Sequence, residues 1–439
     1  MSRVLEYRAR ERDLVKATHV CQYWRSTLTS SPTLWSCSWF HTSPDFDRIL
    51  TYLERSKSAP IDVNINTSCP DDLDIVKYFI PHIARTRSLI ICESYTQPVS
   101  FLFCNPAPSL QRLEIHALNK DFVCLPENFL GQQPSSLRFV SFNGICPTFE
   151  TFFPLPNLTE FHLYLHRGMG PFSMSALFRF FSDSPLLQKV YIGITGQTIQ
   201  DIPLDQVISL ESLVELEYTH NLGDRVLPYL RLPRLKQFRV LTSIEPGEVQ
   251  RLADILPYDG SILLAGVTRM SYYSDARSLR VDLSGNEVGV SFVASCTIEN
   301  PSVDWFSDQT CIPFGQIEDL EVDGHSTDMN FHVNALVFEN LRVLRIIRWE
   351  RQLSERLLRM LHPDLGTGVP CRSLRKIECT CWTSSESLLR SLASLVKKRK
   401  RAGHRLELVC LPFVQESNQD LMEELREHVG EVLADDMND

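Results

Sequence analysis

The stretch PSLQRLEI, residues 108–115, carries the pattern that decides the fold of this chain. Its apolar residues are Leu110, Leu113 and Ile115, so the second follows three residues after the first and the third follows two residues later. Leu113 and Ile115 fall on one face of an extended strand, because side chains alternate between the two faces. The proline and serine at the start interrupt a preceding helix. The stretch therefore predicts a short strand with one buried face.

The same apolar triad returns along most of the chain. Strong copies are Leu137-Val140-Phe142, Leu158-Phe161-Leu163, Leu187-Val190-Ile192, Leu213-Leu216-Tyr218, Leu235-Phe238-Val240, Ile317-Leu320-Val322, Leu341-Leu344-Ile346 and Leu374-Ile377-Cys379, with weaker copies at Thr86-Leu89-Ile91 and Ala276-Leu279-Val281. First positions in the stronger run lie roughly 21 to 29 residues apart, a period that resembles that of leucine-rich repeats. The fold class indicated is α/β: an irregular leucine-rich-repeat-type solenoid with a parallel sheet.

Segments between the strands carry apolar residues at helical spacing, as in Met174–Phe181 and Ser387–Val396, and are expected to be outer helices. Between residues 244 and 305 the period stretches, which predicts an insertion or a lost strand, with Ser291–Asn300 forming local β structure. In a solenoid no repeat buries its apolar face alone, and the exposed strand residues form a long concave face suited to binding another macromolecule. Chance matches of the triad in a leucine-rich globular protein are the alternative.

Composition restricts the function. The net charge of −10 argues against a general nucleic-acid binder, whose surface would be basic. No P-loop, dinucleotide-binding turn, nucleophile elbow or zinc-protease helix is present, so the sequence indicates no enzyme, no cofactor and no small-molecule substrate. The thirteen cysteines are scattered singly, as is typical of reduced thiols in the cytoplasm or nucleus. We interpret Cys379 and Cys381 as such thiols and His325, Asp328 and His332 as a polar loop, and predict no metal site.

Targeting signals are few. The charged N-terminus is unlike a signal peptide, and no apolar run reaches the length of a membrane span, so we expect no membrane association and a cytoplasmic or nuclear protein. The basic run Lys397–Arg401 reads either as a nuclear signal or as cations that stabilise the C-terminal end of a helix ending before Gly403. We prefer the helix end. Residues 413–439 are acidic and predict a terminal helix that covers the last repeat.

The first forty residues are predicted to be helical. Leu14, Ala17, Cys21, Trp24 and Leu28 recur at spacings of three and four, which places them on one stripe of a single helix. Asp13 is a plausible N-cap, and the proline of Ser30-Ser31-Pro32 ends the helix. A second apolar cluster follows directly and contains Leu34, Trp35, Trp39 and Phe40.

The strings VCQYWR, residues 20–25, and SPTLW, residues 31–35, resemble the C-terminal half of an F-box. YLERSKSAPIDV, residues 52–63, and RTRSL, residues 85–89, are similar to segments that follow the box in a large family of fungal F-box proteins. A complete box opens with a leucine-proline pair and an apolar helix, whereas here a strongly charged stretch of about a dozen residues precedes Leu14, which suggests a truncated or a degenerate box. The resemblance implies that residues of this segment bind the adaptor subunit of a cullin-RING ubiquitin ligase: Leu14, Val20, Cys21, Trp24, Arg25, Pro32, Leu34 and Trp35.

The resulting expectation is a substrate receptor: residues 1–40 as a partial F-box, residues 41–412 as the repeat array and residues 413–439 as the acidic tail. The adaptor and a target protein would be its partners, and the chain would act by proximity rather than by catalysis. A stand-alone scaffold is the alternative, in which Trp24 and Trp35 only anchor the first repeat. An unrecognised enzyme is the third hypothesis, and it would need a pocket of converging titratable side chains.

Overall fold

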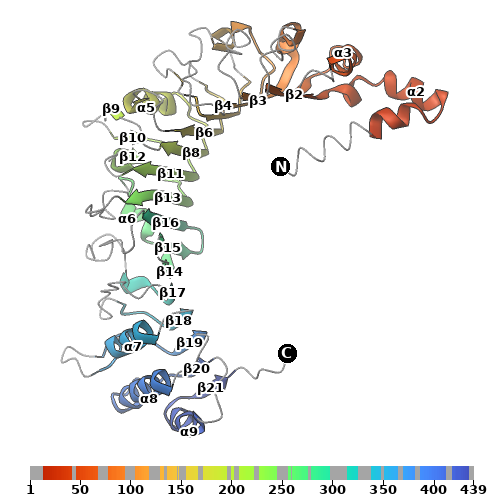
Figure 1. Cartoon of the computed structure of the whole chain (residues 1–439). Coiled ribbons are helices and arrows are strands. Elements are labelled where there is room, and N and C mark those ends of the chain that lie inside the picture. The colour runs from red at the N-terminus through yellow and green to blue at the C-terminus, as the bar shows by residue number, and fades with distance from the viewer. Residues whose placement is uncertain are drawn as a thin grey trace. The chain divides into compact units, whose positions relative to one another are not determined.

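The computed structural model of the chain describes residues 13–41, 46–67, 78–93, 104–117, 129–132, 136–145, 147, 155–166, 172–194, 199–201, 207–221, 227–244, 256–258, 260–274, 278–296, 314–324, 338–347, 351–363, 369–380, 386–411 and 418–434. They form a mixed α/β protein with a large, mostly parallel sheet and few helices (Figure 1). The chain divides into two compact units: Met1–Leu216 with Arg231–Arg234, and Glu217–Leu230 with Leu235–Asp439.

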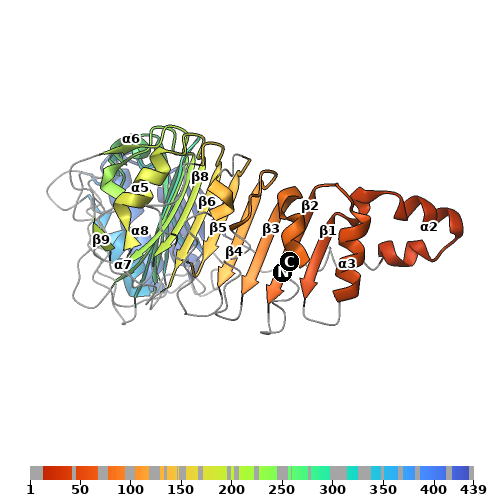
Figure 2. The same cartoon turned by 90° about the horizontal axis from the view of Figure 1, so that it is seen from above.

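The strands of the first unit lie side by side in chain order, and all of them are parallel (Figure 2). They are β1 (Cys37–His41), β2 (Ile61–Thr67), β3 (Thr86–Glu93), β4 (Arg112–Ala117), β5 (Phe139–Asn143), β6 (Glu160–Leu165) and β8 (Lys189–Ile194). The triads predicted the strands β3, β4, β5, β6 and β8, and the prediction of parallel strands at these positions is confirmed.

The register aligns the triads into buried rows across the sheet, which we call rungs. One rung consists of Val63, Leu89, Leu113, Val140, Phe161 and Val190, and the next of Ile65, Ile91, Ile115, Phe142, Leu163 and Ile192. Every member of both rungs is buried. Since a shift by one residue would turn each rung toward solvent, burial specifies the register.

Helices of the first unit include residues 13–18, α2 (Gln22–Thr29), α3 (Phe46–Arg55) and α5 (Met174–Ser182), with the 3₁₀ helices η1 (Pro32–Trp35), η4 (Ile80–Arg85) and η6 (Phe129–Gln132). The short strands β7 (Phe172–Ser173) and β9 (Ile199–Asp201) pair in parallel, and β10 covers Ile208–Ser209. The helix expected over Met174–Phe181 is α5. Its Phe180 and Phe181 pack on Phe161 with ring centroids 5.1 and 5.8 Å apart.

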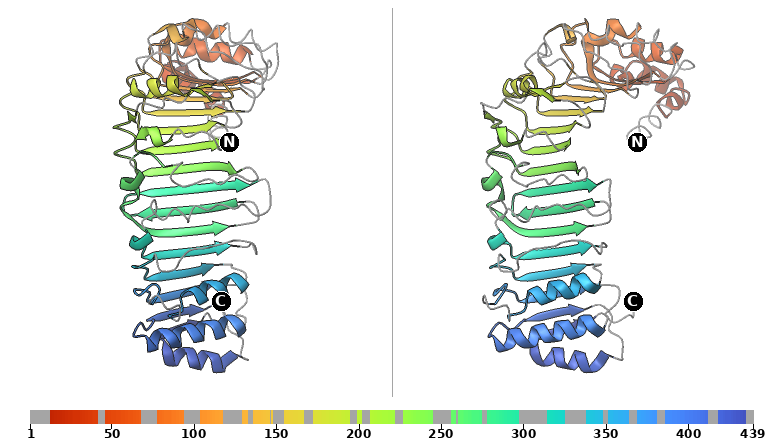
Figure 3. Two further views of the ribbon diagram at one scale, coloured as in Figure 1. Left: turned by 90° about the vertical axis from the view of Figure 1, so that its left-hand side faces the viewer. Right: turned by 60° about the vertical axis from the view of Figure 1, so that its left-hand side comes forward.

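The second unit contains a run of strands in which one is reversed (Figure 3). Its strands are β13 (Gln237–Ile244), β14 (Val267–Ser274), β15 (Ser278–Gly285), β16 (Gly289–Cys296), β17 (Asp319–Gly324), β18 (Val343–Ile347), β19 (Lys376–Thr380), β20 (Leu408–Leu411) and β21 (Glu431–Ala434). Their spatial order is β13-β16-β15-β14-β17-β18-β19-β20-β21, and only the β14–β15 and β15–β16 pairs are antiparallel among these described pairings. Two further strands, β11 (Glu215–Asn221) and β12 (Leu230–Arg231), hold residues of both units.

The weak triad Ala276-Leu279-Val281 predicted one more parallel strand. This prediction is wrong, because Leu279 and Val281 belong to β15, the middle strand of the antiparallel meander β14–β15–β16. Within it, β15 runs opposite to the other strands. The meander is the insertion expected between residues 244 and 305, and β16 includes much of the local β structure expected from Ser291. The two outer strands of the meander, β14 and β16, run in the same direction, because β15 reverses the chain between them. As a result, β16 pairs in parallel with β13, and β14 pairs in parallel with β17. The reversed strand therefore leaves the parallel sheet on either side intact.

Helices of the second unit are α6 (Gly260–Leu264), α7 (Arg351–Met360), α8 (Glu386–Arg401) and α9 (Gln419–His428), with the 3₁₀ helices η7 (Leu227–Tyr229) and η9 (Phe314–Gln316). The helix expected over Ser387–Val396 is α8, and α8 lies between α7 and α9. None of the helices among the described residues is long and apolar enough to cross a membrane.

The basic run Lys397–Arg401 is the last part of α8, as the helix-end interpretation predicts. Lys397 pairs with Glu424 of α9 at 2.8 Å, and Lys400 donates to the backbone carbonyl of Glu427 at 2.8 Å. Arg399 is fully buried and donates to the carbonyls of Pro370 and Cys371. The chain leaves the helix through Gly403, whose φ of 84° favours glycine.

The acidic tail contains the expected terminal helix, α9, which packs along α8 and has the buried side chains Met422 and Leu425. It also contains β21, which the sequence did not predict and which pairs with β20. The sheet thus continues past residue 412 to Ala434.

Candidate interaction site

The N-terminal helical segment is interrupted, contrary to the single helix predicted from Leu14 to Leu28. Residues 13–18 are helical, a turn follows, and α2 begins at Gln22. Asp13 already lies within the first helix, so it is not the N-cap. The break is stabilised locally: the Thr18 hydroxyl donates to the Val15 carbonyl at 2.6 Å, and Arg25 Nε donates to the Thr18 carbonyl at 3.0 Å. Side-chain bonds of this kind compete with the helical backbone bonds.

Cys21 is the N-cap of α2 rather than a member of a helical stripe. Its backbone is extended, and its Sγ accepts the Trp24 backbone N–H at 3.5 Å. The helix ends at Thr29, before the Ser30-Ser31-Pro32 stop, and Pro32 begins η1. The interruption turns Cys21 and Trp24 toward solvent, where a continuous helix would have placed them on one packed stripe.

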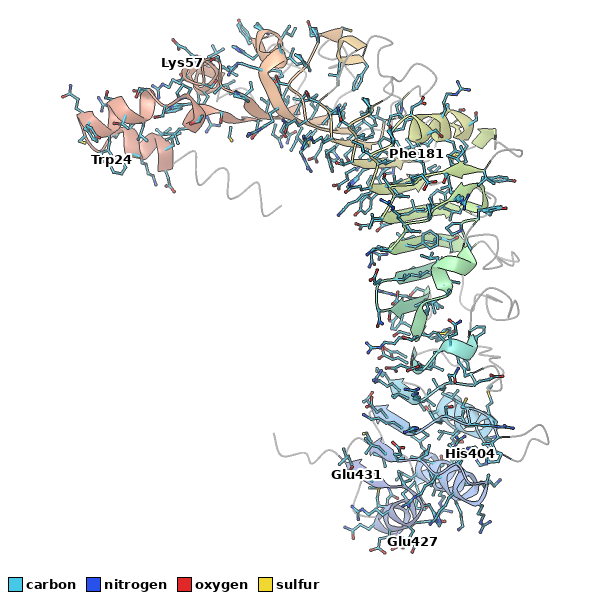
Figure 4. The ribbon with its side chains drawn as sticks, turned by 180° about the vertical axis from the view of Figure 1, so that it is seen from behind. Trp24, Lys57, Phe181, His404, Glu427 and Glu431 are labelled. Atoms are coloured by element: carbon cyan, nitrogen blue, oxygen red, sulfur yellow. The ribbon has the colours of Figure 1, made fainter. Side chains whose placement is uncertain are left out.

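The predicted adaptor-binding residues divide into exposed and packed groups. Val20, Trp24 and Leu34 are 67%, 50% and 45% exposed. Cys21 and Arg25 are also exposed, whereas Leu14 and Pro32 are half-buried. Trp35 is buried, with only 1% of its surface exposed. Figure 4 shows the side chain of Trp24 on the helical segment.

Tyr23 was not among the predicted residues, yet it is the most exposed large apolar side chain among the described residues, at 76%. It lies beside Trp24 on the first turn of α2. The sequence contains a signal for this exposure, because Tyr23 lies outside the predicted apolar stripe and an aromatic residue on the polar side of a helix is not needed for the core. We call Val20, Tyr23, Trp24 and Leu34 the N-terminal apolar group.

Trp35 joins the helical segment to the sheet. Its ring packs edge-on against Tyr52 of α3 at 4.9 Å, and the Arg55 guanidinium lies 4.4 Å from the ring centroid. The indole Nε1 donates to the Leu28 carbonyl at the end of α2 at 2.8 Å. Trp35 is therefore an anchor between α2, η1 and α3, and in this structure it is unsuited to direct contact with a partner.

The two family-like segments after the box are in contact with each other. Arg85 donates to the carbonyls of Leu53 and Ala59 and to the Ser56 hydroxyl, at 3.1, 2.7 and 2.9 Å. Burial lowers the pKa of Arg85 from its ordinary value. Two residues later, Arg87 makes a bidentate ion pair with Asp62. The two arginines of residues 85–89 thus hold the end of α3 and the start of β2, which belong to residues 52–63.

Metal-binding geometry is absent from the described residues: no group of three or more His, Cys, Asp or Glu side chains could hold an ion there. Cys379 is a buried member of a rung on β19. Cys381, His325, Asp328 and His332 lie outside the described residues.

Comparison with known proteins gives no family. No protein-family model matches the chain, and no curated protein matches it either. The site must therefore be interpreted from its own geometry.

Proposed function

We propose that the chain is a non-enzymatic protein-interaction subunit, a substrate receptor of a cullin-RING ubiquitin ligase whose N-terminal segment holds the adaptor. The observation that carries the proposal is the N-terminal apolar group: large apolar side chains left in solvent within one short segment. Exposed apolar groups of this kind mark sites of protein association. Residues at helical spacing on such a segment suit a groove on a partner.

The proposal includes an irregular leucine-rich-repeat-type solenoid as the scaffold. Its support is the repeated triad, which lies on successive parallel strands with its apolar members in register. The scaffold would offer its solvent-facing strand residues to a target protein, and the complex would act by proximity. The scattered single cysteines favour the cytoplasm or nucleus as its compartment.

The test measures binding of the full chain to the purified adaptor subunit by isothermal titration calorimetry. Trp24→Ala and Tyr23→Ala should each weaken binding by at least about tenfold, since aromatic residues dominate interface energies. Tyr258→Ala is the matched control, because Tyr258 is 62% exposed but belongs to the second unit. Absence of adaptor binding by the unaltered chain would remove the proposal.

A stand-alone interaction scaffold is the second candidate, and the buried position of Trp35 favours it. In that case the helical segment serves only to cover the start of the sheet. Trp35→Ala should lower stability by about 3–5 kcal/mol under either hypothesis, because a buried aromatic ring is lost. Trp24→Ala separates the two, since Trp24 is half exposed and should contribute little to stability. A variant that is stable yet loses the adaptor supports the receptor.

A further inference from the structure

The solvent-facing side of the first unit's sheet carries a cluster of rings on three adjacent strands. Phe139 of β5, His162 and Tyr164 of β6 and Tyr191 of β8 occupy outward positions, where solvated sheets usually carry polar residues. The His162 ring is central: its centroid lies 5.0 Å from Phe139, 4.2 Å from Tyr191 and 6.5 Å from Tyr164. We call these four residues the ring cluster.

Gly193 of β8 shapes this surface. A Cβ placed there would lie 2.7 Å from Cδ1 of Tyr164, so the Tyr164 ring lies across the position that a larger residue would fill. The glycine therefore allows the Tyr164 ring to rest against the sheet.

Carboxylates surround the ring cluster, and each is held by partners. Glu114 accepts from Arg112 Nε at 2.5 Å and lies 3.4 Å from His116 Nε2. Glu160 lies 2.8 Å from His162 Nε2. Glu215 accepts from the Tyr191 hydroxyl at 2.5 Å and pairs with Lys189 at 3.1 Å. These groups are oriented before any partner arrives.

The charges of this face favour a cationic partner. Burial alone would raise the pKa of Glu114 and of Glu215, but hydrogen bonds and nearby cations outweigh it and lower both values. Burial lowers the pKa of His162, partly opposed by Glu160, so the ring is neutral near pH 7. This face carries three carboxylates and two cations: Glu114, Glu160 and Glu215 against Arg112 and Lys189. Among these described groups the balance is one negative charge, on a chain of net charge −10.

The face already holds one guanidinium of its own. Arg112 lies 3.7 Å above the Phe139 ring and donates to Glu114. A ring beneath a guanidinium and a carboxylate beside it form a favourable site, because the ring attracts the cation and the carboxylate accepts its planar donors. A similar combination recurs at Tyr191 of β8, whose hydroxyl donates to Glu215 and whose ring packs on His162, the partner of Glu160.

The outward positions of strands in the second unit provide a contrast. On β17, β18 and β19 they include Asp319, Arg345, Lys376 and Glu378 and no aromatic residue. Arg345 bridges Asp319 at 2.6 Å and Glu378 at 2.7 Å, so charge there pairs with charge within the sheet. A sheet face of this fold thus does not need rings to be stable.

We propose that the ring cluster and its carboxylates bind an arginine side chain on a segment of a target protein. The guanidinium would lie on the ring of Tyr191 with Glu160 and Glu215 beside it, and the ring of Tyr164 would contact the rest of the arginine side chain. This deepens the proposed receptor function by assigning the chemistry of the target, and it can fail on its own because adaptor binding by the N-terminal segment is measured separately.

The experiment uses the full chain and fluorescein-labelled octapeptides that alternate serine with arginine, lysine or glutamate, followed by fluorescence anisotropy at physiological salt. The arginine peptide should bind, and the double variant Glu160→Gln with Glu215→Gln should weaken it by at least about tenfold. Glu378→Gln is the matched control, a carboxylate paired with cations on a face without rings. It should change binding less than about twofold.

A second variant guards against loss of folding. Gly193→Ala keeps every charge and should displace the Tyr164 ring, weakening the arginine peptide by about threefold or more while the melting curve stays cooperative. The proposal is overturned if the arginine peptide does not bind, if the lysine or glutamate peptide binds as tightly, or if Glu378→Gln weakens binding as much as the double variant.

Discussion

The sheets of the two units bury the same kind of residue but differ in strand direction and in the side chains that face solvent. In the first unit every described strand pair of the main sheet is parallel and the outward face carries rings. In the second unit β15 runs backwards and the outward face of β17 to β19 carries ion pairs. Rungs of buried residues continue through both arrangements.

The difference teaches that burial determines register more strictly than it determines strand direction. Across the meander, Phe238, Val290, Leu283, Met270 and Leu320 form one rung although β15 is reversed. Side chains alternate between faces in a strand of either direction, so a reversed strand can still present its apolar residues to the core. The outward residues are free of this constraint and can be specialised for binding.

The largest expected effect comes from removing one rung member in each unit. Phe161 and Phe292 are both fully buried. Phe161→Ala and Phe292→Ala should each lower the free energy of unfolding by about 3–5 kcal/mol, through lost burial and the cavity left behind. Urea denaturation followed by circular dichroism measures both. A cost below about 1 kcal/mol for Phe292→Ala would show that the meander is not packed like the parallel strands beside it.

A smaller effect should distinguish two arginines that hold backbone carbonyls. Arg399 in the second unit is fully buried, whereas Arg85 in the first is only partly buried. Arg399→Met should cost about 2–4 kcal/mol, since the carbonyls of Pro370 and Cys371 lose their donors away from water. Arg85→Met should cost about 1 kcal/mol, because water can replace the guanidinium. Equal costs in thermal unfolding would contradict this ranking.

As the pH is lowered, the first unit should begin to lose stability at a higher pH than the second unit. The pKa of His162 is lowered by burial from 6.5, so the unfolded chain takes up the proton more readily and stability falls as pH drops below about 6.5. Glu114, Glu215 and Glu378 have pKa values lowered from 4.5, so their contributions are present above about 4.5 and are lost below it. His162→Gln should flatten the decline between pH 7 and 5. Unit-resolved hydrogen exchange measures it, and an unchanged slope would refute the role of His162.

The smallest effect is expected for the ion pairs on the second unit's outward face. Arg345 and Glu378 are both partly exposed, so solvent screens their attraction. A double-mutant cycle with Arg345→Gln and Glu378→Gln should give a coupling energy below about 1 kcal/mol, and it should shrink further in high salt. A coupling of several kcal/mol would mean that the pair is effectively buried.

Much of the sheet could be predicted because its signal is local. Each triad, such as Leu110, Leu113 and Ile115, combines a strand period with proline punctuation, and the structure buries these residues in register. The triad Val267, Met270 and Tyr272 of β14 has the same spacing but is not among the predicted copies, because the lengthened period around it separates it from the regular run. The direction of β15 could not be predicted, because alternation looks the same in a parallel and an antiparallel strand.

The candidate site was less predictable than the sheet. The motif of residues 20–35 located the segment, but the sequence left the same two interpretations open for Trp24 and Trp35: contact with the adaptor or an anchor for the first repeat. The local bonds at Thr18 and Cys21 break the helix and expose Trp24, whereas α3 covers Trp35. Exposure depends on which distant element packs on a residue, and spacing does not contain that information.

The amino-acid sequence by itself determined the buried triads, the helix ends shortly before Pro32 and Gly403 and the absence of recognisable catalytic motifs, because each depends on near neighbours in the chain. Only the tertiary structure decided the direction of β15, the burial of Trp35 and the gathering of Phe139, His162, Tyr164 and Tyr191 on one face. Those features depend on which elements pair and pack with one another in the folded chain, and the free energy of such pairing belongs to the assembled sheet rather than to any one segment.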